Sequence, residues 1–196
     1  MKSLLLRSPL GGIVLFAGLI LSAPSQASDF EAALSSETAQ FTFRSDSSVI
    51  GWGGAELGVG LFYNDKSDFA GQFSLMQRRQ SSKEAPLTFG VGIRVYAGEL
   101  DDISKTLVAA AIGGEIRYTI PGIMPMSIYL SGHLAPKITS FSDSDGVEDI
   151  NLGFQIEVLP QTTAFAGIRR LDIDVADLGN YQMDDDNVHF GVRFVF

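Results

Sequence analysis

The sequence predicts an all-β protein, an antiparallel transmembrane β-barrel. Apolar and polar residues alternate with a period of two through most of the chain after residue 55, as in strands with two different faces. The first 27 residues have the pattern of an export signal, and the last alternating segment ends on an aromatic residue, Phe196. Together these features predict an eight-stranded barrel over residues 55–196.

The N-terminal segment 1–27 is expected to be a cleaved signal peptide. Lys2 and Arg7 form its basic start, Leu10–Leu21 is its apolar run, and Ser25-Gln26-Ala27 places small residues at the cleavage site. A membrane-spanning helix needs about 20 apolar residues, and this run is shorter. The mature protein is therefore expected to be exported.

The composition excludes several classes of function. The chain has 14 basic and 23 acidic residues and a net charge of −9, which is unsuited to binding nucleic acid through phosphates. It has no cysteine, which excludes disulfides, zinc–thiolate sites and thiol nucleophiles. The sequence indicates no cofactor and no metal site; the acidic segment 143–149 lacks the spacing of a calcium-binding EF-hand loop.

The alternating segments define the predicted strands. They are residues 55–63, 69–77, 87–97, 106–118, 126–134, 150–158, 163–173 and 188–196. Residues 28–54 are expected to form an N-terminal periplasmic extension or an additional strand. Because Phe30, Ala32 and Leu34 alternate there, as do Phe41 and Phe43, a ten-stranded barrel is the alternative.

The polar face of these strands is expected to line the lumen. A membrane barrel turns its apolar face to lipid, whereas a soluble barrel turns it inward. Glycines and charges of both signs interleave on the polar face, which favours a narrow lumen over a solvated surface. The predicted lumen charges are Arg94, Glu115, Arg117, Glu157, Arg169 and Arg193. An eight-stranded interior is just wide enough for side chains to fill, so a packed plug is favoured over an ion path.

The connections predict the orientation in the membrane. Short proline-containing turns at 121–125 and 160–162 are expected at the periplasmic end, together with both termini and the longer connection 78–86. Longer acidic loops at 98–105, 136–148 and 174–187 are expected outside the cell.

The C-terminal residues have the pattern of an outer-membrane assembly signal. His189, Gly191, Phe194 and Phe196 occupy the positions polar, glycine, aromatic and aromatic of that pattern. The barrel-assembly machinery is expected to capture this strand by edge pairing. The other expected partners are outer-membrane lipids and lipopolysaccharide. Arg170, on the lipid face near the outer end of its strand, is expected at headgroup level beside a lipopolysaccharide phosphate.

The mature chain resembles the YfaZ family of small Gram-negative outer-membrane proteins. The resemblance lies in Gly167-Ile168-Arg169-Arg170-Leu171-Asp172, the acidic segment after it, the terminal residues 191–196, and Ser131-Gly132-His133-Leu134-Ala135-Pro136. It implies a signal peptide, a β-barrel and a location in the cell outer membrane, and no catalytic residues.

We therefore expect a non-enzymatic outer-membrane barrel of structural or interaction type with acidic loops outside. A narrow pore for small solutes or ions is the alternative. A lipid-modifying hydrolase using Ser131 and His133 is less favoured, because residues two apart on one strand face lie about 7 Å apart and the pair would face the lumen. A soluble periplasmic barrel is the remaining alternative.

Overall fold

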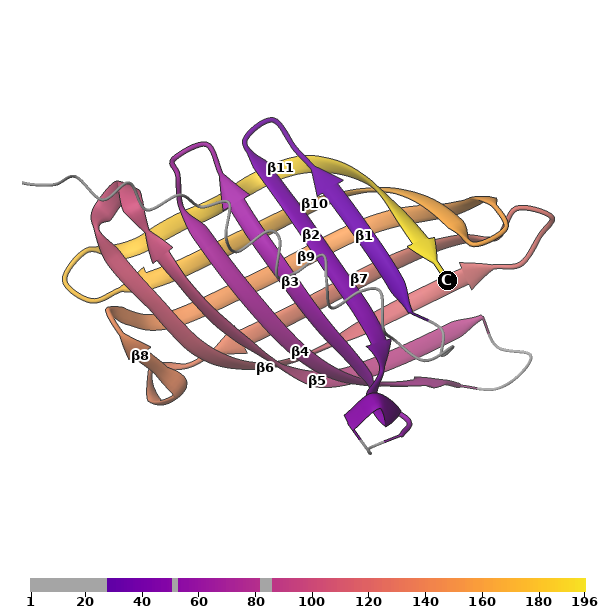
Figure 1. The fold of residues 1–196 in the computed structure, drawn as a ribbon, viewed down its shortest axis with the longest axis horizontal. Helices are drawn as coiled ribbons and strands as arrows, with labels where there is room; N and C mark the ends of the chain where they lie inside the picture. The colour runs from indigo at the N-terminus through magenta and orange to yellow at the C-terminus, as the bar shows by residue number, and fades with distance from the viewer. Residues whose placement is uncertain (1–27, 51–52, 82–85) are drawn as a thin grey trace, which may run out of the picture.

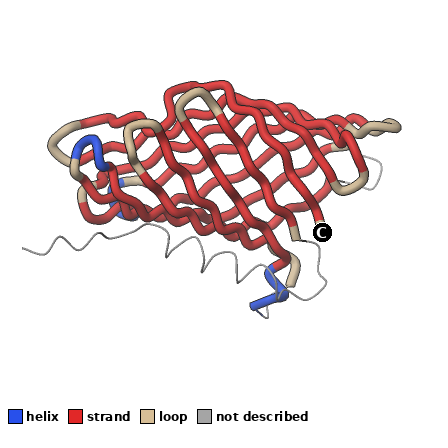
Figure 2. The backbone as a smooth tube through the Cα atoms, turned by 45° about the horizontal axis from the view of Figure 1, so that its top comes forward, coloured by secondary structure: helices blue, strands red, loops and turns tan. Residues whose placement is uncertain are grey.

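The computed structural model, which describes residues 28–50, 53–81 and 86–196, is a closed antiparallel β-barrel (Figures 1 and 2). In the described residues ten strands form the ring, each paired with its neighbours, and the β5–β6 pairing closes it. The ring strands are β1 (Asp29–Leu34), β2 (Thr38–Asp46), β3 (Glu56–Asn64), β4 (Phe69–Gln80), β5 (Leu87–Leu100), β6 (Lys105–Ile120), β7 (Met126–Ala135), β9 (Ser144–Leu159), β10 (Thr162–Val175) and β11 (Gly179–Val195).

Three 3-10 helices and one short strand lie at the ends of the ring. The 3-10 helices η1 (Ser47–Ile50), η2 (Asp101–Ile103) and η3 (Lys137–Thr139) lie in connections. Strand β8 (Ser140–Ser142) lies outside the ring order and pairs with β6 at 107–109, past the point where β7 stops pairing with it. No helix in the described part of the chain is both long and apolar enough to cross a membrane.

The predicted strand number of eight is wrong, and the ten-stranded alternative is confirmed. Residues 28–54, left open between an extension and a strand, supply β1 and β2. β1 pairs with β2 on one side and with the C-terminal strand β11 on the other, so it is a full member of the ring. These strands have only six and nine residues, which made their alternation hard to distinguish from an extension. The predicted signal peptide lies outside the described residues.

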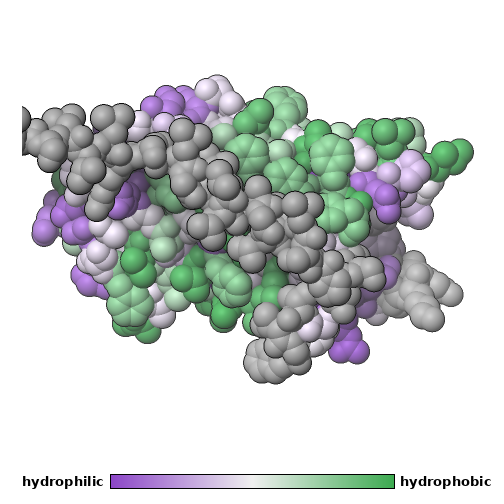
Figure 3. Space-filling view, in the orientation of Figure 1, coloured by the Kyte–Doolittle hydropathy of each residue, from purple (hydrophilic) through white to green (hydrophobic). Residues whose placement is uncertain are grey.

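The face assignment agrees with the prediction for a membrane barrel. Outward residues of the central strands are apolar and exposed; Val91 and Ile112 are 67% and 70% exposed, whereas Glu115 on the inner face is buried. The space-filling view shows apolar side chains across the middle of the visible face, with polar ones toward its ends (Figure 3). This outward apolar band continues to Leu34, Ile168 and Val188.

The predicted long acidic loops are wrong, because most of those residues extend the strands. β5 and β6 continue until only four residues, 101–104, connect them, and β10 and β11 are joined by 176–178. Along most of these extensions the outward residues are polar and the inward ones apolar, the reverse of the pattern in the band; the buried Asp184 of β11 is an exception. The reversal disguised the strand period in the sequence.

One part of the wall is shorter than the rest. β11 starts at Gly179, but it pairs with β1 only over Phe190–Val195, because the β1–β2 hairpin turns at residues 35–37. Above that hairpin, the outer part of β11 therefore meets the β3–β4 turn through side chains instead of a strand ladder. Figure 1 shows the β1–β2 hairpin ending before the long β10–β11 hairpin at the left.

Candidate functional site

The barrel encloses a cavity of about 290 Å³ in the half nearer Ser28 and Phe196, the ends of the described chain, which we call the terminal end. Side chains at its terminal end are the more accessible ones: Glu56 is 30% and Arg78 27% exposed. At its inner end Asp149 is 2% and Arg169 4% exposed. This gradient shows that the cavity opens toward the termini and becomes enclosed toward the middle of the barrel.

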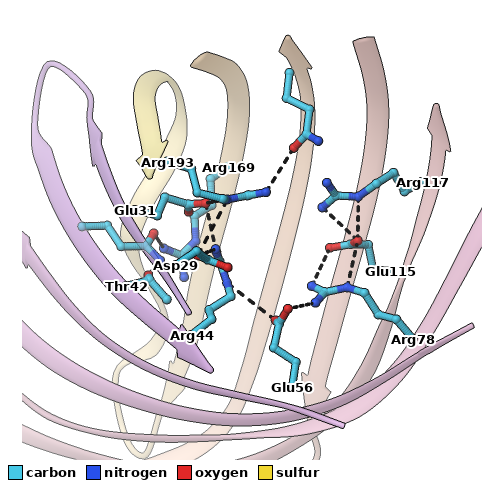
Figure 4. Close-up of polar contacts among 12 residues, drawn as sticks. Asp29, Glu31, Thr42, Arg44, Glu56, Arg78, Glu115, Arg117, Arg169 and Arg193 are labelled. Atoms are coloured by element: carbon cyan, nitrogen blue, oxygen red, sulfur yellow. Dashed lines mark hydrogen bonds and ion pairs between the residues drawn. The ribbon is translucent and has the colours of Figure 1, made fainter. Parts of the chain in front are cut away.

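One group of ion pairs at the mouth of the cavity centres on Glu31 of β1. Its Oε2 accepts hydrogen bonds from Arg193 Nη2 (2.6 Å) and Nε (2.9 Å), and lies 3.0 Å from Arg44 Nη2. Arg44 Nη1 also donates to Asp29 Oδ1 at 2.8 Å. Figure 4 shows these side chains converging from β1, β2 and β11. The group thus ties the two terminal strands to each other and to β2.

A second group at the mouth centres on Glu115 of β6. Arg117 Nε donates to Glu115 Oε1 at 3.0 Å, and Arg78 Nε lies 3.4 Å from the same oxygen. Arg78 also pairs with Glu56, whose other oxygen lies 3.7 Å from Arg44 Nε. The two groups therefore form one continuous chain of alternating charges around the mouth (Figure 4).

The inner end of the cavity holds a separate cluster around Asp149 of β9. Arg94 Nη1 and the Tyr96 hydroxyl each donate to Asp149 Oδ2 at 2.6 Å. Arg169 donates from Nε to Oδ1 (3.0 Å) and from Nη2 to Oδ2 (3.1 Å), and its Nη1 donates to Gln40. A buried carboxylate is costly unless it is paired and hydrogen-bonded, and this one receives four donors. The cluster links strands β2, β5, β9 and β10 across the lumen.

Beyond this cluster the interior of the outer half is apolar and closed. We call this part the apolar plug; its buried members are Phe62, Ala70, Tyr96, Leu100, Leu107, Ala109, Ala111, Ala135, Val147, Leu171, Ile173, Val175 and Met183. Leu107 and Ile173 are 0% exposed. In the described residues, the cavity therefore does not continue through the outer end of the barrel.

Side-chain contacts close the wall where the β1–β2 hairpin is short. Tyr181 of β11 donates from its hydroxyl to Asp68 Oδ2 in the β3–β4 turn at 2.6 Å. Asn64 Nδ2 donates both to Asp68 Oδ2 (2.9 Å) and to the carbonyl of Met183 (3.3 Å). Burial of Tyr181 and its contact with Asp68 raise the pKa of the phenol. The turn is thereby fastened to β11 above the apolar band.

The structure brings five of the six predicted lumen charges to the cavity wall. These are Arg94, Glu115, Arg117, Arg169 and Arg193. Glu157 does not join them; it is exposed near the end of β9, where its backbone N–H donates to the Pro125 carbonyl at 3.0 Å.

Sequence reasoning missed six charged residues of the cavity. They are Asp29, Glu31, Arg44, Glu56, Arg78 and Asp149. Three of them lie in segment 28–54, and Glu56 lies at the start of the predicted strand 55–63. Arg78 lies in the expected connection 78–86, and Asp149 directly follows the expected acidic loop 136–148. Continuing the period-two count through these segments would have placed them on the inner face.

Ser131 and His133 do not form a catalytic pair. Both nitrogens of the buried His133 ring lack a hydrogen-bond partner within the described chain. A nucleophile needs a base within hydrogen-bond reach, which this pair does not provide. No group of three or more histidine, cysteine or acidic residues in the described ranges is arranged to hold a metal ion.

The residues of the predicted assembly signal occupy both faces of β11. His189 lines the cavity, while Phe194 and Phe196 are exposed on the outside. At Gly191 a side chain would collide with the ring of Phe165, so glycine leaves room for that ring. Arg170 lies on the outer face directly beyond Ile168 and pairs with Asp172 at 2.7 Å.

Comparisons with known proteins find a likeness of fold. The structure is similar to a bacterial polysaccharide outer membrane secretin (TM-score 0.47, 14% identity, 89% of this chain and 66% of that one). It is also similar to the outer membrane channel DcaP of Acinetobacter baumannii (TM-score 0.40, 9% identity, 89% and 55%). A scan of protein-family models and a search of curated proteins found no match. The chain spans less than two thirds of the length of either similar structure. Because both TM-scores are below 0.5, no function is transferred from these structures to this chain.

Proposed function

We propose that this chain is a small integral outer-membrane β-barrel of structural or interaction type, closed at its outer end. The outward apolar band supports membrane insertion, because a barrel in water would expose polar residues there. With both termini at the periplasmic end, the charged cavity opens to the periplasm and the acidic hairpins face outside. Lipid and lipopolysaccharide are the proposed neighbours, with Arg170 at the level of the outer headgroups.

The observation that favours a closed barrel over a pore is the apolar plug. Water and ions need a continuous polar path, and Leu107 and Ile173 fill the interior beyond the Asp149 cluster. The mouth also holds equal numbers of arginines and carboxylates in mutual contact, as expected for a cross-linked interior. The closed interior favours a structural or interaction role over conduction.

Two measurements on purified protein in mild detergent test this proposal. A closed membrane barrel migrates faster unboiled than boiled on a gel, and we expect that shift. In planar lipid bilayers we expect no stepwise conductance. The absence of a gel shift would contradict the barrel in detergent, and reproducible conductance steps would favour the alternative of a narrow pore.

The proposed export and assembly steps have their own test. Deletion of Phe196 is expected to reduce the amount of protein in the outer-membrane fraction, because it removes the terminal ring of the assembly signal. Phe89→Ala, which removes another exposed outward ring, is the matched control and should have a smaller effect. A soluble periplasmic barrel would tolerate both changes. Membership of the YfaZ family stays a prediction.

A further inference from the structure

The cavity has an imbalance of charge and an unpaired arginine donor, which an interior of fully paired charges would lack. Its wall carries six arginines and five carboxylates, although the whole chain has a net charge of −9. The imbalance is located at the inner end: the four arginines at the mouth face four carboxylates, whereas Arg94 and Arg169 share Asp149. Among the side chains that line the cavity, positive charge therefore exceeds negative charge at the enclosed end. The buried Asp184, which lies outside the lining, offsets part of the charge of Arg169.

Arg94 is the arginine with donors to spare. It makes both of its hydrogen bonds, to Asp149 Oδ2 (2.6 Å) and to the Tyr96 hydroxyl (3.5 Å), through Nη1 alone. Its Nε is buried and has no partner within the described chain. Arg169 differs, because its three guanidinium nitrogens all donate, two to Asp149 and one to Gln40. Leaving a buried charged donor unpaired is costly. Because Arg94 lines the cavity, an acceptor bound there could pair with its guanidinium.

The surroundings of Arg94 also suit an acceptor. Ser74, its paired neighbour on β4, lines the cavity beside it. Ser131 and Asn151, which pair with each other across β7 and β9, line the cavity next to Glu115, nearer the mouth. These side chains add neutral donors without adding negative charge. Asp184 approaches this region from the outer side, but it does not line the cavity.

We propose that the inner end of the cavity is a binding site for a small oxyanion, a carboxylate or phosphate group, that enters from the terminal opening. Planar guanidinium edges bind the paired oxygens of such groups through charge-assisted hydrogen bonds. The volume of about 290 Å³ limits the ligand to a small solute. The site rests on the proposed periplasmic opening and gives the proposed interaction role a ligand class.

Calorimetric titration of the folded full-length barrel with inorganic phosphate, and separately with acetate, tests the site. We expect one anion per barrel. Arg94→Gln should weaken binding about tenfold or more, the loss typical of one charge-assisted contact. Asp149→Asn should strengthen it by a similar factor, because both inner arginines lose their shared carboxylate. Preference for phosphate or for acetate identifies which kind of solute supplies the oxyanion.

Matched variants separate a site from a general effect of charge. Arg78→Gln removes the same charge at the mouth and should change affinity less than about threefold, since Arg78 is already paired with Glu56 and Glu115. Arg94→Lys keeps the ion pair but loses the planar guanidinium, so it should also weaken binding. This variant replaces Asp149→Asn in the comparison if Asp149→Asn does not fold. Each variant is scored only if its unboiled band shows a folded barrel.

Three results would overturn the site. These are a folded wild-type barrel that binds neither anion, an equal loss in Arg78→Gln and Arg94→Gln, and an Asp149→Asn barrel that binds no more tightly than wild type. Any of these in a heat-modifiable, non-conducting barrel removes the anion site and leaves the proposed function intact. A missing gel shift or conductance steps would instead contradict the proposed function.

Discussion

The two halves of the barrel interior are built from the same strands but differ in chemistry. Near the termini the inward residues are charged and surround a cavity, whereas in the outer half they are apolar and pack into a plug. β10 shows the change along a single strand: Arg169 points inward at the cavity, and Leu171 and Ile173 point inward at the plug. The outward residues change in the opposite sense, from Ile168 to Asp174.

This difference follows from what surrounds the wall. Inside a membrane the outward face must be apolar, so polar residues can only face the lumen. Beyond the apolar band the outward face meets water, and the interior can then be closed by hydrophobic packing as in a soluble barrel. The strand period continues unchanged while the polarity of its two faces exchanges. The position of that exchange, near Arg170 on β10, marks the outer edge of the band.

The largest expected effect concerns the charged half. Asp149→Ala should destabilise the barrel by about 3–5 kcal/mol, because it leaves two buried arginines without their carboxylate. Glu56→Ala, at the accessible mouth, should cost about 1 kcal/mol or less. Urea unfolding of the barrel in lipid vesicles measures both. Equal losses would mean that the cavity is as wet at its inner end as at its mouth.

The apolar half should respond to loss of volume. Leu171→Ala removes a 1%-exposed plug side chain and should cost about 2–5 kcal/mol. Ile168→Ala, three residues earlier on the outward face, should cost less, because lipid can fill the space that the side chain leaves. The same unfolding measurement compares the two variants. A greater loss for Ile168→Ala would contradict a packed core at the outer end.

The smallest expected effect is a pH dependence at the outer end, beyond the apolar band. Burial raises the pKa of Asp184 from its usual range to about 6, while Arg169 and Asn187 partly oppose the shift. Its stabilising contribution is therefore complete below about pH 4 and is lost as the pH rises through about 6. After solvent screening we expect about 1 kcal/mol or less. Asp184→Asn should flatten the dependence of stability on pH between 4 and 7; an unchanged profile would assign that dependence to another group.

The sequence predicts the fold class and part of the lumen, but not the closed end. Outward apolar residues such as Val91 and Ile112 and five of the six lumen charges follow directly from the alternation within the band. The alternation could not reveal the plug, because apolar inward residues among aspartates read as an irregular loop. It also could not show that Asp149 is shared by two arginines, since that contact joins strands distant in the sequence.

The central claim, a wet half and a dry half in one interior, can be tested by the reactivity of single cysteines. The chain has no native cysteine, so Ser74→Cys in the cavity and Ala109→Cys in the plug can be compared without background. A small charged methanethiosulfonate reagent is added to the folded barrel in detergent, and the modification rates are measured. We predict rapid modification at residue 74 and protection at residue 109 until the barrel is unfolded. Similar rates at the two positions would contradict the account.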